Sequence, residues 1–343
     1  MSILLNGKLK VTVFGESHSE SIGAVLEGFP AGFKVDFDAL ASDMARRKAS
    51  LSAYSTKRLE PDRVEVQCGI FDGYTTGAAI CLLIRNENVK SSDYANLKRV
   101  PRPSHADYPA HVKYGGFEDY RGGGQFSGRL TAPVVAAGNL AKQWLKARGV
   151  SVEARIKSIA GISAGEEFLP PSEKVWAKML AEIERVAAEK SSCGGIVEGR
   201  ICGLPAGLGG PMAESVESRL AGMLYAVPAV KGVSFGLGFG FADAFGRDAN
   251  DPYILREGRI VPATNRNGGV LGGITTGADI LFSAAFKPVP SVAAVQDSVD
   301  TETLEPVKLE IQGRHDVCIV PRAVPVVEGA AALCAMDLML EGR

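Results

Sequence analysis

Apolar residues recur at helical spacing in four stretches of the chain, which are residues 38–48, 131–148, 173–189 and the last 20. In the first stretch Leu40 and Met44 share one face, and Asp36 or Asp38 is placed to cap the first turn. The second stretch stops at Gly149, a residue suited to a helix C-cap. The pattern therefore predicts four helices, the last of which closes the chain.

Alternating apolar and polar positions predict strands between these helices. The candidate strands are residues 9–14, 64–67, 79–84, 152–156, 196–201 and 280–286. Short hairpin-like links outnumber regular strand–helix–strand units, and no low-complexity linker divides the chain. We therefore expect one α+β domain over residues 1–343, built as a layered sandwich and not as a doubly wound parallel sheet.

A twelve-residue segment occurs twice in the sequence. Residues 69–80 and 269–280 are identical at seven of twelve positions, and an apolar strand follows each copy. Chance similarity of a common turn is one explanation. A strand–turn–strand unit used twice is the other, and it predicts an internally duplicated antiparallel sheet unit within one domain.

The composition is that of a globular protein with a substantial core, at 46% hydrophobic and 22% charged residues. A net charge of -1 argues against general electrostatic binding to nucleic acid or to an anionic membrane. No uninterrupted apolar run approaches the roughly 20 residues that span a bilayer, and the N-terminus lacks a signal-peptide pattern. The six cysteines include no Cys-x-x-Cys pair, which predicts reduced thiols in a cytoplasmic protein and no metal site.

Three of the four histidines lie in short polar segments, at residues 15–19, 102–107 and 313–316. Histidine is the usual proton carrier near neutral pH, so this repeated placement indicates proton chemistry. Any one of the three alone would be better explained as a surface-loop histidine. The 40 glycines form several clusters, which indicates loops shaped around a bound molecule.

Positive charge gathers around a glycine-rich loop and a helix end. Arg121 and Arg129 bracket the loop before the helix at residue 131, an arrangement suited to an anion. The cations at residues 46–48 are explained equally well by a solvated helix C-terminus. Residues 236–241 resemble a dinucleotide fingerprint only superficially, because no helical pattern follows. Residues 248–251 fit either a cation site or a plain turn.

The residues themselves thus indicate an enzyme with a polyanionic small substrate and histidine acid/base groups, and they leave the reaction open. A series of longer motifs is similar to those of the chorismate synthase family. They are Phe14-Gly-Glu-Ser-His18, Arg102-Pro-Ser-His-Ala-Asp107, Asp119-Tyr-Arg-Gly-Gly-Gly124, Asn267-Gly-Gly-Val-Leu-Gly-Gly-Ile274, and Gly313-Arg-His-Asp316 followed by Pro321-Arg-Ala-Val-Pro325.

This resemblance implies a β-α-β sandwich, usually in a homotetramer. From the net charge and the lack of a long apolar run, we expect no nucleic-acid or membrane partner. The resemblance implies the last step of the shikimate pathway, in which 5-enolpyruvylshikimate 3-phosphate loses phosphate by 1,4-elimination and gives chorismate. Reduced FMN is required although there is no net redox change. NADPH would be a further cofactor if the enzyme reduces its own flavin.

The resemblance also implies roles for individual residues. His18 corresponds to a histidine proposed to protonate the departing phosphate, and His105 to one proposed to protonate the reduced flavin. Asp316 matches an aspartate that assists hydrogen transfer, and Ser17 and Ser127 match serines that support proton transfer. The implied flavin contacts are Gln125, Phe126, Ser127, Ala229, Gly272, Lys287, Pro288, Val289, Pro290, Ser291 and Arg314. The implied substrate or nicotinamide contacts are Arg46, Arg47, Arg58, Arg129 and Arg322.

The chain departs from the family pattern at several positions. Gln125 and Phe126 stand where the family usually has Arg-Ser, and Ala53 replaces an arginine, so two expected cations are missing. His111 has no counterpart in the motifs and is expected to be structural, whereas His315 is expected to position the flavin-contacting segment. Two other classes remain open. A flavin-storage protein would not need His18 and His105 together, and another phosphate-handling lyase or transferase would need no flavin.

Overall fold

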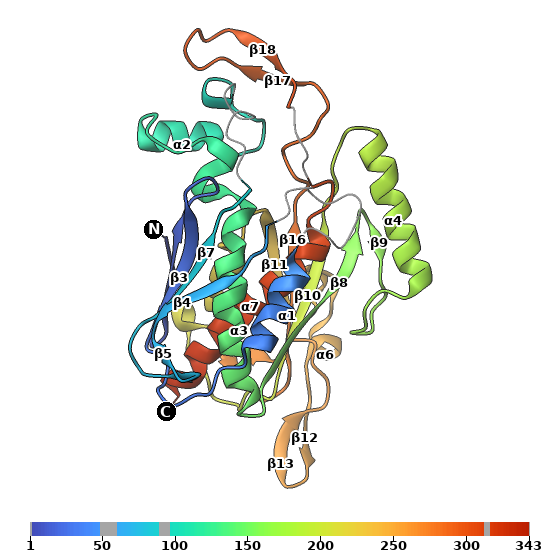
Figure 1. The fold of residues 1–343 in the computed structure, drawn as a ribbon. Helices are drawn as coiled ribbons and strands as arrows, with labels where there is room; N and C mark the ends of the chain where they lie inside the picture. Colours follow the sequence, from blue (N-terminus) through green and yellow to red (C-terminus); the bar gives the residue numbers. More distant parts are fainter. Residues whose placement is uncertain (1, 49–59, 89–96, 312–315, 343) are drawn as a thin grey trace.

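Two five-stranded sheets enclose a layer of helices in the computed structural model, which describes residues 2–48, 60–88, 97–311 and 316–342 (Figure 1). The first sheet has the order β1 (Ser2–Asn6), β2 (Lys10–Gly15), β3 (Ser21–Glu27), β7 (Ile80–Arg85) and β4 (Val64–Cys68). The second has the order β11 (Val230–Phe235), β16 (Ile280–Phe286), β10 (Gly195–Cys202), β8 (Ser151–Ile159) and β9 (Ile162–Ser163). All strand pairings between the described residues are antiparallel, so the α+β expectation is confirmed.

The helical layer contains α1 (Phe37–Arg47), α3 (Thr131–Lys146), α5 (Val216–Tyr225) and α7 (Val320–Glu341). Helix α4 (Glu173–Ala188) packs beside β9, and α2 (Asp107–Tyr114) lies at one end of the molecule. The four helices predicted from periodicity are therefore present. Asp36 is the N-cap of α1, since its side chain accepts hydrogen bonds from the amides of Asp38 and Ala39. Helix α3 ends three residues before Gly149, with Ala147 as its C-cap.

The two halves of the chain repeat one arrangement of elements. The order β2-β3-β7-β4 in the first sheet corresponds to β8-β10-β16-β11 in the second. The duplicated segment forms the hairpins β5 (Ile70–Phe71)–β6 (Tyr74–Thr75) and β14 (Val270–Leu271)–β15 (Ile274–Thr275). The hydroxyl of Thr75 donates to the Pro30 carbonyl at 2.7 Å, and that of Thr275 donates to the Pro205 carbonyl at 2.7 Å. The predicted duplication is confirmed, and the structure shows in addition that the same threonine bond anchors each hairpin.

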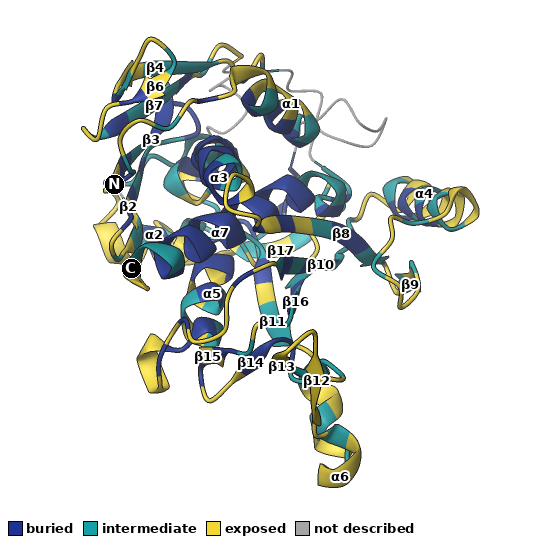
Figure 2. Cartoon of the chain, turned by 90° about the horizontal axis from the view of Figure 1, so that it is seen from below, coloured by how far each residue is buried: buried dark blue, intermediate teal, exposed yellow. Residues whose placement is uncertain are grey.

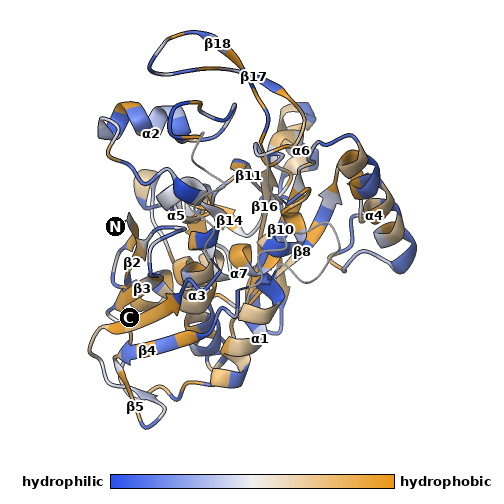
Figure 3. Ribbon diagram, turned by 45° about the horizontal axis from the view of Figure 1, so that its top comes forward, coloured by the Kyte–Doolittle hydropathy of each residue, from blue (hydrophilic) through white to orange (hydrophobic). Residues whose placement is uncertain are grey.

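The centre of the fold is the crossing of α3 and α7, which Figure 2 shows buried between the two sheets. The backbones touch where Gly138 meets Gly329, because a Cβ on Gly138 would overlap the Gly329 Cα. Helix α7 is long and apolar enough to cross a membrane by length and composition, but 89% of its apolar window is buried inside the fold. Its hydrophobic character, clear beside the mostly hydrophilic α2 in Figure 3, is thus used in the core.

Smaller elements project from this body. The hairpin β12 (Tyr253–Arg256)–β13 (Arg259–Pro262) extends from one end, and β17 (Gln296–Val299)–β18 (Pro306–Leu309) from the other (Figure 1). The remaining elements are the helix α6 (Gly246–Ala249) and the 3-10 helices η3 (Arg121–Phe126), η4 (Gly128–Leu130), η5 (Met212–Glu214) and η6 (Gly238–Asp243). Residues 236–241 thus enter a 3-10 helix and do not form a dinucleotide loop.

Candidate active site

A cavity of about 870 Å³ lies where the two halves of the fold meet, beside the N-terminal ends of α3 and α7. The first half contributes the end of α1 and residues 122–131. The second half contributes residues 225–231, 286–291 and 316–326. Helix N-termini carry a partial positive charge, so two of them at one cavity favour an anionic ligand.

Most of the residues proposed from the sequence border this cavity. They are Ser17, Arg47, His105, Gln125, Phe126, Ser127, Arg129, Ala229, Lys287, Val289, Pro290, Ser291, Asp316 and Arg322. Arg58 and Arg314 lie outside the described residues. The fold therefore gathers into one space residues that are up to about 300 positions apart in the sequence.

Besides His18, which packs against Gly122, three of the proposed residues do not border the cavity. Arg46 turns away from the cavity and forms a two-bonded ion pair with the buried Glu328, at 2.7 and 2.8 Å. Gly272 lies in the β14–β15 hairpin, which precedes β16, whereas the cavity borders the opposite end of that strand. Pro288 is exposed and packs beside Gly194. Within one chain these three residues do not contact the space that the others share.

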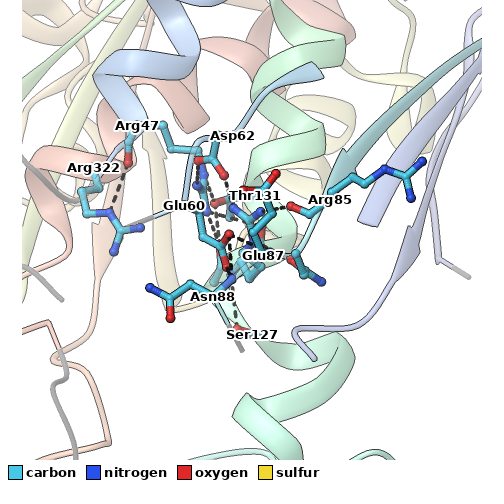
Figure 4. Close-up of polar contacts among 12 residues, drawn as sticks. Arg47, Glu60, Asp62, Arg85, Glu87, Asn88, Ser127, Thr131 and Arg322 are labelled. Atoms are coloured by element: carbon cyan, nitrogen blue, oxygen red, sulfur yellow. Dashed lines mark hydrogen bonds and ion pairs between the residues drawn. The ribbon is translucent and has the colours of Figure 1, made fainter. Parts of the chain in front are cut away.

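Asp62 joins two buried arginines at the wall of the cavity (Figure 4). One carboxylate oxygen accepts from Arg47 Nη1 at 3.0 Å, and the other accepts from Arg129 Nη1. All three side chains are at least nine-tenths buried. A single carboxylate thus compensates two cations, which leaves a net positive charge at the wall.

Arg47 was expected to bind a ligand, but most of its hydrogen-bond donors contact other parts of the protein. Its Nε donates to the Thr131 hydroxyl at 3.0 Å, and its Nη2 donates to the carbonyls of Gly128 and Arg129. These bonds tie the end of α1 to the start of α3. Burial, together with the neighbouring Arg322 and Arg129, lowers the pKa of Arg47 to about 9, which still leaves it charged near neutral pH.

Among the described arginines that border the cavity, Arg322 has the most donors left for a ligand. Its Nη1 donates to Asp316 Oδ2 at 2.5 Å and its Nε donates to the Arg47 carbonyl at 3.2 Å, while no contact uses Nη2 among the described residues. A guanidinium edge of this kind can bind a carboxylate or phosphate through two parallel bonds. Figure 4 shows Arg322 beside Arg47.

The triple-glycine segment packs against both histidines of the proposed site. A Cβ on Gly122 would lie 2.6 Å from the His18 ring, and one on Gly123 would lie 3.1 Å from the His105 ring. Gly122 and Gly123 have φ values of 58° and 81°, which L side chains rarely adopt. The amide of Ser17 donates to the Gly124 carbonyl at 3.1 Å. These glycines therefore fit around two side chains of the protein, where the sequence suggested that they fit around a ligand.

His18 and His105 differ in exposure to the cavity. His105 borders it directly, whereas His18 is buried and packs against Gly122, whose Cβ position would also lie 2.8 Å from Oγ of Ser17, the next residue in the chain and one that does border the cavity. Ser17 and Ser127 both reach the cavity wall, and the Ser127 hydroxyl also accepts from the Arg129 amide at 3.3 Å. The arrangement allows proton transfer at His105 by direct contact and at His18 through its neighbour.

Arg121 does not join the anion site predicted from the glycine loop. Its Nε donates to Asp119 Oδ1 at 2.7 Å, and its side chain is 41% exposed. Two lysines supply cations at another part of the wall. Burial, and then the charge of Lys231, lower the pKa of Lys287, because each favours the neutral amine.

Several cavity residues were missed by the sequence analysis. Asp62, Lys231 and Tyr225 border the cavity but carry no sequence signal of their own. Arg102 and Asp107 lie in a recognised motif on either side of His105, and that spacing could have indicated a shared function.

The contacts of Asp251 favour the plain turn over the cation site as the explanation of residues 248–251. Its carboxylate accepts hydrogen bonds from Thr264, Arg266 and Asn267.

The fold and the cavity together define an α+β protein whose central space is bordered by arginines, lysines and His105, a set of side chains that suits a polyanionic ligand. A family model described as "Chorismate synthase" matches residues 9–340. The chorismate synthase of Pyrococcus abyssi is 47% identical over 98% of this chain and 97% of its own length. That of Dehalococcoides mccartyi (strain 195) is 42% identical over 99% and 97%. A crystal structure of chorismate synthase superimposes with a TM-score of 0.76 at 26% identity, covering 97% of this chain and 92% of that one.

The chain therefore belongs to the chorismate synthase family, as its motifs indicated, and the protein is an enzyme of the lyase class. The solved relative also confirms the sandwich fold.

Proposed function

We propose that the protein catalyses the reduced-FMN-dependent 1,4-elimination of phosphate from 5-enolpyruvylshikimate 3-phosphate, giving chorismate. The observation that carries this proposal is the cavity between the two halves, which combines Arg129, Arg322 and Lys287 with His105 and two helix N-termini. A substrate with one phosphate and two carboxylates needs several cations, and this wall supplies them.

The cavity also suits a flavin. Its volume of about 870 Å³ is within the range of cofactor sites. Part of the wall is apolar and can face the flavin ring, formed by Val227, Phe286, Pro290, Ile319 and Val326. Lys287 and Lys231 would hold the phosphate of the cofactor. When bound, the reduced flavin supplies a transient electron that eases phosphate departure and is recovered as hydrogen leaves.

The protein's own residues bind, orient and transfer protons. Arg322 and Arg129 would bind anionic groups of the substrate, and Asp316 would hold Arg322 in place through its 2.5 Å ion pair. His105 would exchange a proton with a ligand in the cavity, while His18 and Ser17 would deliver a proton to the departing phosphate. The buried glycine segment over both histidines would keep water away from them.

Further features belong to the same proposal. The two sheets share one helical layer, which supports a single domain over residues 1–343. Large exposed apolar side chains on the projecting β12–β13 hairpin support a homotetramer. We place the protein in the cytoplasm, with NADPH as a further cofactor if it reduces its own flavin.

The proposal is tested by anaerobic turnover of His18→Ala and His105→Ala with substrate and chemically reduced FMN. Loss of a proton-transfer group should lower the rate of chorismate and phosphate release by roughly 10²- to 10⁴-fold. His111→Ala is the control, because His111 lies on α2 near Glu118, with Nδ1 3.3 Å from Oε1, and does not border the large cavity. Near-wild-type turnover in His18→Ala or His105→Ala would contradict the role of that histidine.

A further inference from the structure

Two buried side chains, those of Arg102 and Asp107, surround one edge of the His105 ring. Arg102 donates twice to Asp107 Oδ2, from its amide at 3.0 Å and from Nε at 2.7 Å, and once to Oδ1 from Nη2 at 2.8 Å. Asp107 Oδ1 also lies 2.5 Å from His105 Nδ1. The side chains of Arg102 and Asp107 are 4% and 8% exposed, so this network is shielded from solvent.

The contact between His105 and Asp107 determines where the ring carries its proton. Two acceptor atoms do not approach to 2.5 Å without a proton between them, so Nδ1 must be the donor. Arg102 Nη2 lies 3.1 Å from the same Nδ1, but a guanidinium can only donate and therefore cannot bond to a protonated nitrogen. Nε2 lies on the opposite edge of the ring, next to Gly123, which has no side chain to cover it.

The charge on Asp107 is fixed by the same contacts. Burial alone raises the pKa of Asp107, but the hydrogen bonds from Arg102 and His105 outweigh it and hold the pKa well below its ordinary value. Asp107 also lies in the first turn of α2, where a helix N-terminus favours a negative charge. The carboxylate is therefore a permanent acceptor for Nδ1 across the working pH range.

The network also contacts a second segment of the cavity wall, residues 287–291. Arg102 Nη1 donates to the Ser291 hydroxyl at 3.1 Å, and Lys287 Nζ donates to the Ser104 carbonyl. The loop that carries His105 is thus bound at two points to residues 287–291, the segment proposed to contact the flavin. A ring held in this way keeps one orientation toward a ligand.

We propose that Arg102 and Asp107 are positioning residues, which hold His105 in the Nδ1-protonated tautomer and make Nε2 the atom that exchanges protons in the cavity. The consequence for catalysis rests on the proposed function, whereas the tautomer does not depend on it. Asp107 does not border the cavity, and Arg102, which does, directs its donors to Asp107 and Ser291. Asp107 orients the ring, and Arg102 orients Asp107 while balancing its charge.

The first test is the ¹⁵N NMR spectrum of the histidine side chains in the wild-type protein. The chain has four histidines, so a His105→Ala spectrum assigns the ring nitrogens of His105. When the ring is neutral, we expect Nδ1 to resonate as a protonated nitrogen and Nε2 as an unprotonated one. The opposite pattern in the wild-type protein would overturn the proposal, and this measurement requires no Asp107 variant to fold.

The second test compares Asp107→Asn with Glu118→Gln. Glu118 pairs with His111 near the same helix and is the matched carboxylate. Asp107→Asn should change the His105 nitrogen pattern and lower turnover by about 10- to 100-fold, with substrate KM changed by less than about threefold. Added to His105→Ala it should cause no further loss, because both changes act through one ring. Glu118→Gln should alter neither the His105 signals nor turnover.

The outcomes separate the two proposals. An unchanged His105 pattern and unchanged turnover in folded Asp107→Asn would overturn the positioning role. A wild-type protein without flavin-dependent elimination would instead contradict the proposed function, while an Asp107-dependent tautomer in that protein would still support the positioning of His105.

Discussion

Asp62 shows how one residue can decide the charge of the cavity wall. It is the shared partner of Arg47 and Arg129, and replacing it with Asn would leave two buried guanidiniums without a counter-charge. We expect Asp62→Asn to lower the free energy of unfolding by about 3–5 kcal/mol. Glu65→Gln is the control, because Glu65 forms an exposed pair with Arg85 that should contribute at most about 1 kcal/mol.

Urea unfolding of both variants measures this difference. Equal midpoints for Asp62→Asn and Glu65→Gln would mean that water or other groups already compensate the two arginines. The positive charge of the cavity wall could then not be explained by two arginines that share the single carboxylate of Asp62.

Sequence reasoning found the residue types of this site better than their partners. His18, His105 and Asp316 lie in motifs and could be proposed directly. Asp62 could not, because it is 15 positions from Arg47 and 67 from Arg129, and only the fold brings them together. For the same reason Arg47 was expected to bind a ligand, although most of its donors bond to the protein.

At the scale of elements, the crossing of α3 and α7 depends on a missing side chain. A Cβ on Gly138 would overlap the Gly329 Cα, so Gly138→Ala should push the helices apart. We expect it to cost about 1–3 kcal/mol of stability, as other overpacked cores do. Gly222→Ala on α5 is the matched control, since nothing lies within 4 Å of its Cβ position.

Gly222→Ala should instead stabilise the protein by up to about 1 kcal/mol, through better helix propensity. Chemical unfolding of the two variants should therefore give changes of opposite sign in the free energy of unfolding. A stabilising effect of Gly138→Ala would show that the crossing is looser than the structure indicates.

Elements with a clear period were predicted, and elements without one were missed. Residues in strands β2 and β16 alternate between buried and more exposed positions, and this alternation made both strands predictable from the sequence. Strand β3 was missed because Ile22, Gly23 and Ala24 are buried in succession, so its pattern does not alternate. Helix α2 was missed because it is only eight residues long and contains a proline.

At the scale of the whole molecule, the duplication explains where the cavity lies. Each half supplies a central helix, and the N-terminal ends of α3 and α7 meet at the cavity. The halves have diverged in chemistry. The first supplies His105 and the arginines around Asp62, whereas the second supplies Lys287 and most of the apolar wall. The repeated hairpin in the sequence predicted the two related sheets but not this division.

The projecting β12–β13 hairpin should take part in assembly. Leu255 and Ile260 are opposite each other in the hairpin, and each is 74% exposed, which is costly for apolar side chains in water. If the protein forms the proposed homotetramer, we expect the double variant Leu255→Glu, Ile260→Glu to reduce it to smaller species, as measured by light scattering. Leu304→Glu, at a 77% exposed position before β18, is the control. An unchanged mass in the double variant would exclude this hairpin from the interface.

The most direct test of the central claim is anaerobic product formation by flavin-free protein, with and without dithionite-reduced FMN. If the cavity binds substrate and flavin together, chorismate and phosphate should form in equal amounts only with reduced FMN. Many turnovers should occur per flavin, because the reaction has no net redox change. Equal product formation in the two reactions would contradict the account, since the cavity would then need no flavin.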